Sequence, residues 1–279
     1  MSGIAAGIIL FNPDLDRLRE NIDAIYNQVQ LLVLVDNNSS NIHLVEEEYK
    51  ARENIIIVKN NNNIGIAAAL NQLMSYCQSK DYSWVLTLDQ DSVCPNNLVR
   101  EYVKYLNIPK IALISPVIID RNKNSDEEIN KTAYNNIEKC ITSATLTNVS
   151  IWEEIGGFDD LMFIDLVDFE YCKRIVLNGF KIIRVNNVVL LHEIGHITQH
   201  KFLIWNIDVK NHSAFRKYYM ARNIIYYAKK YKTTGSIIIA YMRIMKLLAI
   251  TMLYEKDKGE KGRAIFKGIK SGRKLKVSI

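Results

Sequence analysis

The segment Trp84-Val-Leu-Thr-Leu-Asp-Gln-Asp-Ser92 decides the fold class of this chain. Residues 84–88 form a largely apolar run of strand length, which is typical of a strand that is covered on both faces. Asp89 and Asp91 follow at once, so two carboxylates come where the buried strand ends. In parallel α/β sheets, ligands bind beyond the carboxyl ends of the strands. The segment therefore predicts a parallel sheet with a polar crevice at this edge.

The alternation of strand and helix extends in both directions from this segment. Further buried strands are predicted at residues 4–11, 31–35, 55–59 and 111–119. Amphipathic helices are predicted between them at residues 15–29, at 65–77 and after Pro95. Alternating elements of this length predict a mostly parallel sheet with helices on both faces.

The alternation changes after residue 119. We expect a loop at 120–131, an edge strand at 140–149, a turn at Gly156-Gly157-Phe158-Asp159 and a helix at 167–178 that Gly179 ends. Residues 182–191 are predicted to form two short strands around Asn186-Asn187. Helices at about 215–230 and 237–253 complete the prediction.

Length and composition exclude several classes of protein. The chain has 279 residues, of which 48% are hydrophobic and 24% charged. These values favour one large α/β domain, alone or with a small appendage, and exclude disordered, collagen-like and coiled-coil chains. The four cysteines form no Cys-x-x-Cys pair, which indicates a reducing compartment. No basic leader precedes the apolar residues 4–11, so no signal peptide is expected.

Charge is distributed unevenly along the chain. Residues 229–279 hold 14 Lys/Arg and 3 Asp/Glu, a balance of +11, whereas the rest of the chain has a balance of −5. An acidic body with a basic extension does not indicate a nucleic-acid-binding protein. Arg243 and Lys246 interrupt the apolar residues 237–254, so no spanning helix is expected there.

The basic extension suggests contact with a membrane. Apolar side chains alternate with its charges (Tyr241, Ile244, Leu247, Leu248 and Met252). Basic residues near anionic lipid contribute about 1 kcal/mol each, so the extension is predicted to hold the protein against an anionic membrane surface. The alternative is a packed C-terminal helix followed by a solvated charged tail.

Three polar clusters are predicted at the carboxyl edge of the sheet: Asp36-Asn37-Asn38, residues 60–65 and Asp89-Gln90-Asp91. Each cluster alone is more typical of an ordinary turn or helix cap than of a ligand site. Together they favour a polar ligand. The two carboxylates of the third cluster suit Mg²⁺ or Mn²⁺, which bind proteins through a few carboxylates together with substrate phosphates.

Asp165, Asp168 and Glu170 lie at the predicted start of a helix. They either stabilise the helix N-terminus or supply a general base. His192-Glu193-Ile194-Gly195-His196 matches the zinc-protease pattern H-E-x-x-H, but the preceding β-branched residues and Gly195 argue against the helix that this site requires. No dinucleotide-binding or P-loop pattern is present, so neither class is predicted.

In this order and spacing, the clusters resemble the family 2 glycosyltransferases of the GT-A fold, and within them the bacterial rhamnosyltransferases of O-antigen and capsule synthesis. The resemblance covers residues 4 to about 230. It rests on Val35-Asp36-Asn37, residues 63–71 (Asn-Ile-Gly-Ile-Ala-Ala-Ala-Leu-Asn), Leu88-Asp89-Gln90-Asp91-Ser92, Ile155-Gly-Gly-Phe158-Asp159, residues 163–174 (Phe-Ile-Asp-Leu-Val-Asp-Phe-Glu-Tyr-Cys-Lys-Arg), His192-Glu-Ile-Gly195 and Tyr218-Tyr-Met-Ala-Arg222-Asn223.

The resemblance implies a Rossmann-like, mixed and mostly parallel sheet, with a GT-A domain at residues 1–230 and a helical basic extension at 231–279. The nucleotide-binding half would cover about 1–119 and the acceptor half about 120–230. The implied reaction is metal-dependent, inverting transfer of L-rhamnose from dTDP-L-rhamnose to a polyprenyl-linked saccharide, at the inner face of the cell membrane.

The resemblance also implies roles for single residues. Asp168 would be the catalytic base, although Val167 stands where many relatives have Glu. The metal would be held by Asp89, Asp91 and His192. The donor side would comprise Asp36, Asn38, Asn63, Gly65, Asn71, Asp89, Gln90 and Asp91, and the acceptor side Asp165, Thr142, Ser143 and Arg222. Ala144 replaces an expected glycine.

Three other functions remain open from the residues. The first is the same fold with a UDP-linked hexose or N-acetylhexosamine as donor, since thymine and uracil differ by one methyl group, worth about 1–3 kcal/mol in a fitted pocket. The second is a catalytically silent subunit that binds a nucleotide sugar. The third, and most remote, is a zinc hydrolase at His192 and His196.

Overall fold

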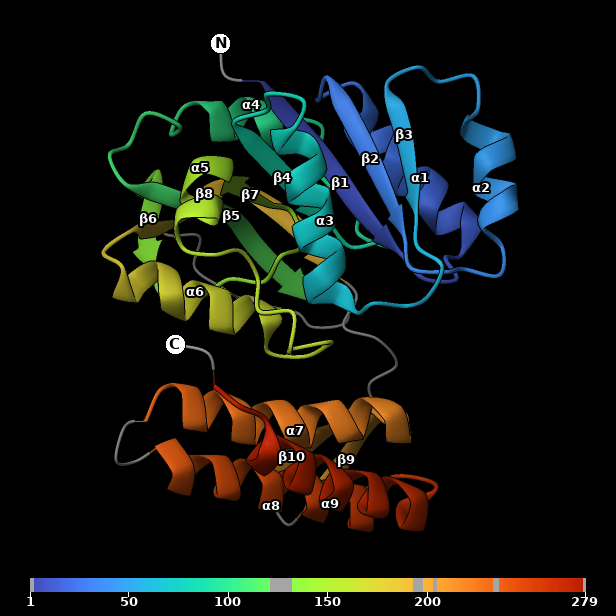
Figure 1. The fold of residues 1–279 in the computed structure, drawn as a ribbon, viewed down its shortest axis with the longest axis vertical. Helices are drawn as coiled ribbons and strands as arrows, with labels where there is room; N and C mark the ends of the chain where they lie inside the picture. The colour runs from blue at the N-terminus through green and yellow to red at the C-terminus, as the bar shows by residue number, and fades with distance from the viewer. Residues whose placement is uncertain (1–2, 121–131, 193–197, 203–204, 233–235, 278–279) are drawn as a thin grey trace. The chain divides into compact units, whose positions relative to one another are not determined.

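The computed structural model describes residues 3–120, 132–192, 198–202, 205–232 and 236–277 (Figure 1). The chain folds into two compact units, which are described separately. Unit 1 comprises Met1–Leu161 and Val167–Glu193. Unit 2 comprises Met162–Leu166 and Ile194–Ile279.

Unit 1 contains an eight-stranded sheet in the order β3-β2-β1-β4-β7-β5-β8-β6. Neighbouring strands among β1–β4 pair in parallel, as do β5 and β8. The strand β7 is antiparallel to both β4 and β5, and β6 is antiparallel to β8. The predicted mixed, mostly parallel sheet is confirmed. The strands are β1 (Ile4–Leu10), β2 (Leu31–Asp36), β3 (Ile55–Lys59), β4 (Trp84–Leu88), β5 (Ile111–Asp120), β6 (Tyr134–Ile137), β7 (Thr145–Asn148) and β8 (Lys181–His192).

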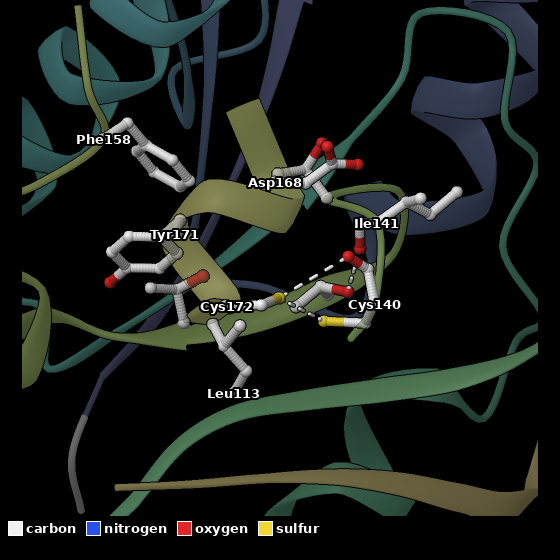
Figure 2. A pocket seen from close by; sticks show the side chains of 10 residues that line it. Leu113, Cys140, Ile141, Phe158, Asp168, Tyr171 and Cys172 are labelled. Carbon is white, nitrogen blue, oxygen red and sulfur yellow. Dashed lines mark hydrogen bonds between the residues drawn. The ribbon is translucent and has the colours of Figure 1, made fainter. Parts of the chain in front are cut away.

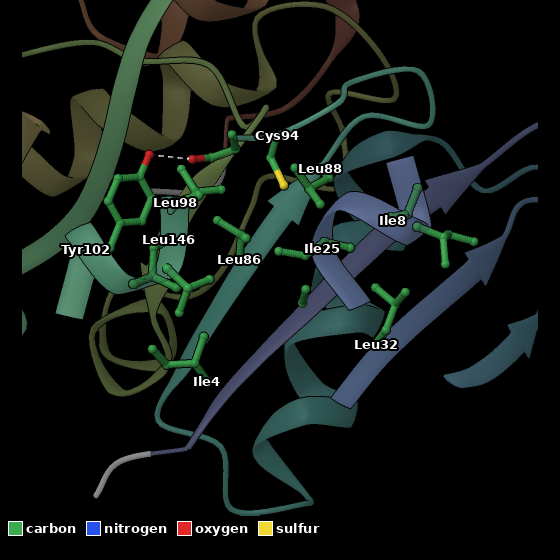
Figure 3. Close-up of a cluster of buried hydrophobic side chains, with 14 of the residues drawn as sticks. Ile4, Ile8, Ile25, Leu32, Leu86, Leu88, Cys94, Leu98, Tyr102 and Leu146 are labelled. Atoms are coloured by element: carbon green, nitrogen blue, oxygen red, sulfur yellow. Dashed lines mark hydrogen bonds between the residues drawn. The ribbon is translucent and has the colours of Figure 1, made fainter. Parts of the chain in front are cut away.

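Helices cover both faces of the β1–β4 region. Alternate residues of β1, such as Ile4 and Ile8, pack with Ile25 of α1 and with Leu98 and Tyr102 of α4 (Figure 3). The residues between them face α3, because a Cβ on Gly7 would lie 2.2 Å from Leu73. The helices of unit 1 are α1 (Leu15–Tyr26), α2 (Ile42–Tyr49), α3 (Ile66–Gln78), α4 (Leu98–Val103), α5 (Val149–Glu154) and α6 (Val167–Leu177).

The strand predicted at the sheet edge, residues 140–149, instead lies inside the sheet as β7. Two threonine hydroxyl groups, one in β7 and one in the neighbouring β4, have internal hydrogen-bond partners. The Oγ1 atom of Thr87 donates to the carbonyl of Thr142 (2.6 Å), and that of Thr145 donates to the carbonyl of Ile141 (2.6 Å). A buried hydroxyl with a hydrogen-bond partner is tolerated in a sheet interior.

The two strands predicted within residues 182–191 are one strand, β8, with a local irregularity. Its pairing with β5 jumps from Val185 to Val189 between consecutive residues of β5. The Nδ2 atom of Asn186 donates to the carbonyl of Thr132 (2.8 Å), and that of Asn187 to Glu101 (2.6 Å). These polar residues therefore form a bulge inside one strand rather than a turn between two.

Unit 2 contains a hairpin of β9 (Thr198–Phe202) and β10 (Trp205–Val209), followed by α7 (Ala214–Lys230), α8 (Ser236–Tyr254) and α9 (Lys258–Lys274). The helices α7 and α9 pack very closely. A Cβ on Gly268 would lie 2.3 Å from the carbonyl oxygen of Tyr218, and one on Gly272 would lie 2.5 Å from that of Arg222. Only glycine permits this approach.

The contacts place the C-terminal elements differently from the sequence prediction. The helix α7 belongs to unit 2, whereas the predicted division at residue 230 follows it. Residues 258–274, within the predicted helical extension, form the helix α9, which packs on α7, whereas the alternative interpretation expected a solvated tail there. Ile244 is buried, and Leu247 and Leu248 pack in the core of unit 2, so these three do not form the predicted membrane-facing surface.

Candidate active site

The carboxyl ends of β1–β4 meet at one edge of the sheet. Register places Leu10 beside Asp36, and Asp36 beside Lys59. Thr87 pairs with Thr145, so the residues that precede β7 reach the same edge as the turn after β4. The predicted polar clusters and the segment from Thr142 to Ala144 thus share one edge of unit 1.

The Asp36 carboxylate is buried and serves its own turn. It accepts hydrogen bonds from the backbone N–H groups of Asn38 (3.1 Å) and Ser39 (3.1 and 3.2 Å). Asn38 adopts a left-handed conformation with φ of 69°. This arrangement is an Asx-type turn, in which the carboxylate fixes the backbone. The side chain predicted to contact the nucleotide therefore has a structural partner already.

The turn after β3 is held by amide side chains. The backbone N–H of Gly65 donates to Oδ1 of Asn63 (2.9 Å), and the φ of 86° at Gly65 favours glycine. Asn37 donates from Nδ2 to the carbonyl of Gly65 (3.3 Å). Gly65 also caps α3, so the turn and the helix start are built together.

Asn71, predicted on the donor side, links α3 to the loop at residues 152–160. Its Nδ2 atom donates to the carbonyl of Phe158 (2.8 Å) and to Asp160 (2.7 Å). Its Oδ1 atom accepts from Nε1 of Trp152 (3.1 Å) and from the N–H of Phe158 (2.7 Å). Two donor and two acceptor bonds use the full capacity of the amide.

The Asp89-Gln90-Asp91 turn is anchored by its neighbours. The side-chain oxygen of Gln90 accepts from the N–H of Phe11 (2.9 Å), and Nδ2 of Asn21 donates to the carbonyl of Asp89 (2.7 Å). The buried hydroxyl groups of Ser92 and Ser143 are 2.9 Å apart. Asp89 is half-buried, while Asp91 is exposed.

This turn fits a divalent cation that shares its coordination with a substrate. Hard carboxylate oxygens suit Mg²⁺ or Mn²⁺, and such ions commonly combine one or two carboxylates with phosphate oxygens and water. The described residues contain no cluster of three or more His, Cys, Asp or Glu side chains that would enclose a metal on its own. His192 ends β8, and its side chain lies outside what the structure describes, as do residues 193–197 of the H-E-x-x-H segment.

The segment before β7 is tightly held. Ala144 is buried with φ of 53°, a conformation that costs non-glycine residues about 1–2 kcal/mol. The hydroxyl of Tyr102 donates to its carbonyl (2.8 Å). The positive φ favours glycine at this position, where a glycine was expected. Ala144 adopts the same conformation at a conformational cost.

Asp168 lines a pocket between α6 and the sheet (Figure 2). Asp168, Tyr171 and Cys172 share one face of α6, at spacings of three and four residues. Leu113 of β5, Thr145 and Thr147 of β7, and Ile141 and Thr142 also line the pocket. The pocket therefore joins a carboxylate to the segment that precedes β7.

Two cysteines, Cys140 and Cys172, also line this pocket. The Sγ atoms of Cys140 and Cys172 are 3.7 Å apart. The pKa of the Cys140 thiol is raised well above its ordinary value by its hydrogen bond with Cys172 and by burial, and the Asp168 carboxylate adds to this rise. The Cys140 thiol therefore stays protonated near neutral pH.

Glu170 has a different environment from Asp168. It is fully buried and pairs with Arg174 through two contacts of 2.8 Å. Arg174 also donates to the carbonyls of Ile155 (2.7 Å) and Gly157 (2.5 Å). This ion pair fastens the turn at residues 155–157 to α6, a role that sequence reasoning did not assign.

Asp165 belongs to unit 2. Arg216 of α7 approaches its carboxylate to 3.2 Å, and the buried Asn223 donates from Nδ2 to the carbonyls of Ile164 (2.7 Å) and Asp165 (2.8 Å). Asp165 and Leu166 are both left-handed, with φ of 69° and 64°. The loop that precedes Asp168 is thus held by α7. We call these contacts of Arg216 and Asn223 the clamp on residues 162–166. Its sequence signal is the segment Tyr218-Tyr-Met-Ala-Arg222-Asn223, on which the resemblance rests.

Arg222, predicted on the acceptor side, contacts two neighbours on α7. Its Nε atom donates to Oδ1 of Asn223 (3.0 Å), and its guanidinium lies 4.5 Å from the centroid of the Tyr219 ring. Tyr219 in turn stacks on Phe163 with ring centroids 4.7 Å apart. Arg222 therefore supports the clamp on residues 162–166.

Comparison with known proteins adds to this geometry. Residues 6–164 match the family model described as glycosyl transferase family 2. The chain is 27% identical over 244 residues to the dTDP-rhamnosyl transferase RfbF of Shigella flexneri, which covers 82% of this chain and 81% of that protein.

Three solved structures with the same fold contain a bound nucleotide or nucleotide sugar. The mannosyltransferase PcManGT from Pyrobaculum calidifontis, in complex with GDP-Man and Mn²⁺, has a TM-score of 0.61 and 16% identity over 96% of this chain and 73% of its own. S. aureus TarS 1-349 with UDP-GlcNAc has a TM-score of 0.63 and 10% identity over 96% and 81%. GalNAc-T7 with UDP, GalNAc and Mn²⁺ has a TM-score of 0.63 and 14% identity over 82% of this chain, which spans 48% of GalNAc-T7. The fold is the GT-A fold that the sequence resemblance implies.

Proposed function

The chain belongs to glycosyl transferase family 2 and is a glycosyltransferase, and we propose that it transfers L-rhamnose from dTDP-L-rhamnose to a lipid-linked saccharide. The observation that carries this proposal is the similarity to RfbF, a dTDP-rhamnosyl transferase, over four fifths of both chains. The anchored acidic turn after β4 and the pocket at Asp168 support it.

On the donor side, we propose that the nucleotide lies along the turns after β2, β3 and β4. Asp36 and Asn38 shape the first turn, Asn63 and Gly65 shape the second, and Asn71 anchors the helix that follows. In this proposal Asp89 and Asp91 would hold Mg²⁺ or Mn²⁺, with His192 beside the diphosphate. A bound cation would neutralise the charge that develops on the leaving diphosphate.

On the acceptor side, Asp168 is the proposed general base. The acceptor hydroxyl attacks the anomeric carbon from the face opposite the diphosphate, a C–O bond forms, and the bond to the diphosphate breaks. The hydroxyl proton passes to the Asp168 carboxylate. Positioning both substrates in line supplies a large share of the acceleration. Thr142 lines the same pocket, and the hydroxyl of Ser143 is hydrogen-bonded to that of Ser92. Asp165, held by Arg216 and Asn223, and Arg222, which bonds Asn223, are proposed to orient the loop before Asp168.

The acceptor is proposed to be a polyprenyl-linked saccharide of O-antigen or capsule synthesis, used at the cytoplasmic face of the membrane. The balance of +11 in residues 229–279 supports a location beside anionic lipid.

Titration calorimetry tests the donor. The protein is titrated with dTDP-L-rhamnose, UDP-glucose and UDP-N-acetylglucosamine, each with and without Mg²⁺ or Mn²⁺. Metal-dependent binding of dTDP-L-rhamnose alone is expected. Tight binding of a UDP-sugar instead would keep the fold and the reaction type but overturn rhamnose as the transferred sugar.

The silent-subunit alternative predicts donor binding without turnover. Slow hydrolysis of the bound donor to free dTDP and sugar, measured without any acceptor, distinguishes the two. A glycosyltransferase with Asp168 as base should release dTDP at a rate that Asp168→Asn lowers, whereas a silent subunit should release none above the uncatalysed rate.

A further inference from the structure

The helix α8 of unit 2 is drawn in Figure 1. Its sequence and burial give it two apolar faces. The inner face carries Ala240, Ile244 and Thr251, which are buried against α7 and α9. A second strip, formed by Ile238, Met242, Met245, Ala249 and Leu253, is exposed. At 100° per residue, this second strip lies opposite the inner face. We name these five residues the outer strip of α8.

The side chains of the outer strip are strongly exposed although they are apolar. Ile238, Met242 and Met245 are 64%, 66% and 63% exposed. By length and composition alone α8 could cross a membrane, a test that core helices of soluble proteins also pass. Most of α8 is not buried, however, so it is not such a core helix.

The orientation of α8 is fixed by contacts at its C-terminal end. The buried Glu255, just after α8, accepts from Lys217 of α7 (2.5 Å) and from Lys261 of α9 (3.1 Å). A Cβ on Gly262 of α9 would lie 2.4 Å from the methyl carbon of Met252. Rotating α8 to hide the outer strip would break this buried ion-pair network, which is costly.

Aromatic and basic side chains extend the outer strip. Phe266 lies one turn beyond Gly262 on the side of α9 that approaches Met252, and it is also exposed. Arg243 and Lys246 of α8 and Arg263, Lys267, Lys270 and Lys274 of α9 are all exposed. An apolar face bordered by many Lys and Arg residues is typical of a helix that lies in the interface of an anionic bilayer. Protein–protein interfaces, in contrast, are depleted in Lys.

We propose that the outer strip of α8, together with Phe266, docks unit 2 on an anionic lipid surface, with α8 parallel to the membrane plane. The helix does not span the bilayer, because Arg243 and Lys246 lie near its middle and α7 and α9 pack along it with charged side chains. This inference rests on the proposed function, since it places the enzyme beside a lipid-linked acceptor.

Co-sedimentation with vesicles tests the docking. The full chain is mixed with vesicles of equal parts phosphatidylglycerol and phosphatidylcholine, or of phosphatidylcholine alone. Binding to the anionic vesicles is expected, and the double variant Met242→Glu/Met245→Glu should lose at least about tenfold in affinity, because two charges replace exposed apolar groups that would insert into the lipid. Leu177→Glu is the matched control, since Leu177 of unit 1 is similarly exposed (61%).

A second variant separates charge from apolar insertion. Arg243→Gln/Lys246→Gln should weaken binding to anionic vesicles by roughly fivefold per charge and leave binding to neutral vesicles unchanged. Thermal unfolding and dTDP-L-rhamnose binding of both double variants should match the unchanged protein, which separates loss of docking from loss of fold or of donor binding.

Several results would overturn the docking proposal. The first is absence of binding to anionic vesicles, and the second is binding of the Met242→Glu/Met245→Glu variant that equals that of the unchanged protein. The third is failure of alkaline carbonate to extract the bound protein from the vesicles, which would indicate a spanning helix. A dimer that this variant dissolves, without any vesicle binding, would assign the strip to a second copy instead. If vesicle binding behaves as expected but dTDP-L-rhamnose does not bind, the docking stands and the proposed donor fails.

Discussion

The turns after β2 and β4 lie at the same edge of the sheet and both carry aspartate, yet they use it differently. Asp36 is buried and bonds the backbone of its own turn, whereas Asp91 is exposed beyond a turn that other residues hold. A carboxylate that shapes a turn is engaged by backbone N–H groups. A carboxylate on a turn shaped by its neighbours remains accessible to a ligand.

The same contrast recurs in α6 over two positions. Glu170 is buried in an ion pair with Arg174, while Asp168 is half-buried and lines the pocket. We call Asp36 and Glu170 the engaged carboxylates, and Asp91 and Asp168 the accessible carboxylates. The comparison predicts that the first pair supports stability and the second pair supports chemistry.

The largest effect is expected at Asp168. Asp168→Asn should lower the rate of transfer by about 10²–10⁴-fold, because the amide cannot accept the hydroxyl proton. Donor affinity measured by calorimetry should stay unchanged. A loss of donor affinity together with the rate would assign Asp168 to the donor side and break the comparison at its most important point.

Asp91→Ala should weaken metal-dependent donor binding by roughly 10–100-fold, because one hard oxygen ligand is removed. Binding measured without metal should change little. Glu154→Ala, an exposed acid in α5, serves as control and should leave both values unaltered. Equal donor affinities for Asp91→Ala and the unchanged protein would contradict the metal assignment.

Glu170→Gln should lower the free energy of unfolding by about 3 kcal/mol, because the largely buried Arg174 loses its charged partner. Denaturant unfolding measures this change. The folded fraction should bind the donor with unchanged affinity. If stability were retained and transfer lost, Glu170 would join the accessible carboxylates.

Asp36→Ala should lower the free energy of unfolding by about 1–3 kcal/mol, since two backbone N–H groups lose their acceptor. Asp36→Asn keeps one carbonyl oxygen and should lose less. The informative result is donor affinity in Asp36→Asn. A large drop without loss of stability would show that the carboxylate contacts the nucleotide directly.

Much of the sheet could be predicted from sequence because its strands are covered on both faces. The run of apolar residues at 84–88 and at 55–59 gives the bounds of β4 and β3 as observed. The position of β7 could not be predicted in this way. Only its pairing with β4 on one side and with β5 on the other shows that it lies inside the sheet.

The sequence predicted at which edge of the sheet the candidate site lies, but not which role each of its side chains has. Parallel topology brings the ends of β2, β3 and β4 together whatever the side chains do. Whether a carboxylate is engaged depends on partners that no local pattern specifies. The Asn71 amide, for example, donates to the carbonyl of Phe158, which is 87 residues away in the sequence. Asn223 donates to the carbonyl of Asp165, which is 58 residues away.

The clamp on residues 162–166 limits where two related chains can be recombined. The chain leaves unit 1 after Leu161, is held by α7, and returns at Val167 to begin the helix that carries Asp168. Two related chains therefore cannot be recombined at residue 193 as independent modules. A hybrid would need Asp165 from one parent to match Arg216 and Asn223 from the other. Selection acting on the chemistry of α6 should thus also constrain a helix encoded some fifty residues later, and the two segments should change together among related proteins.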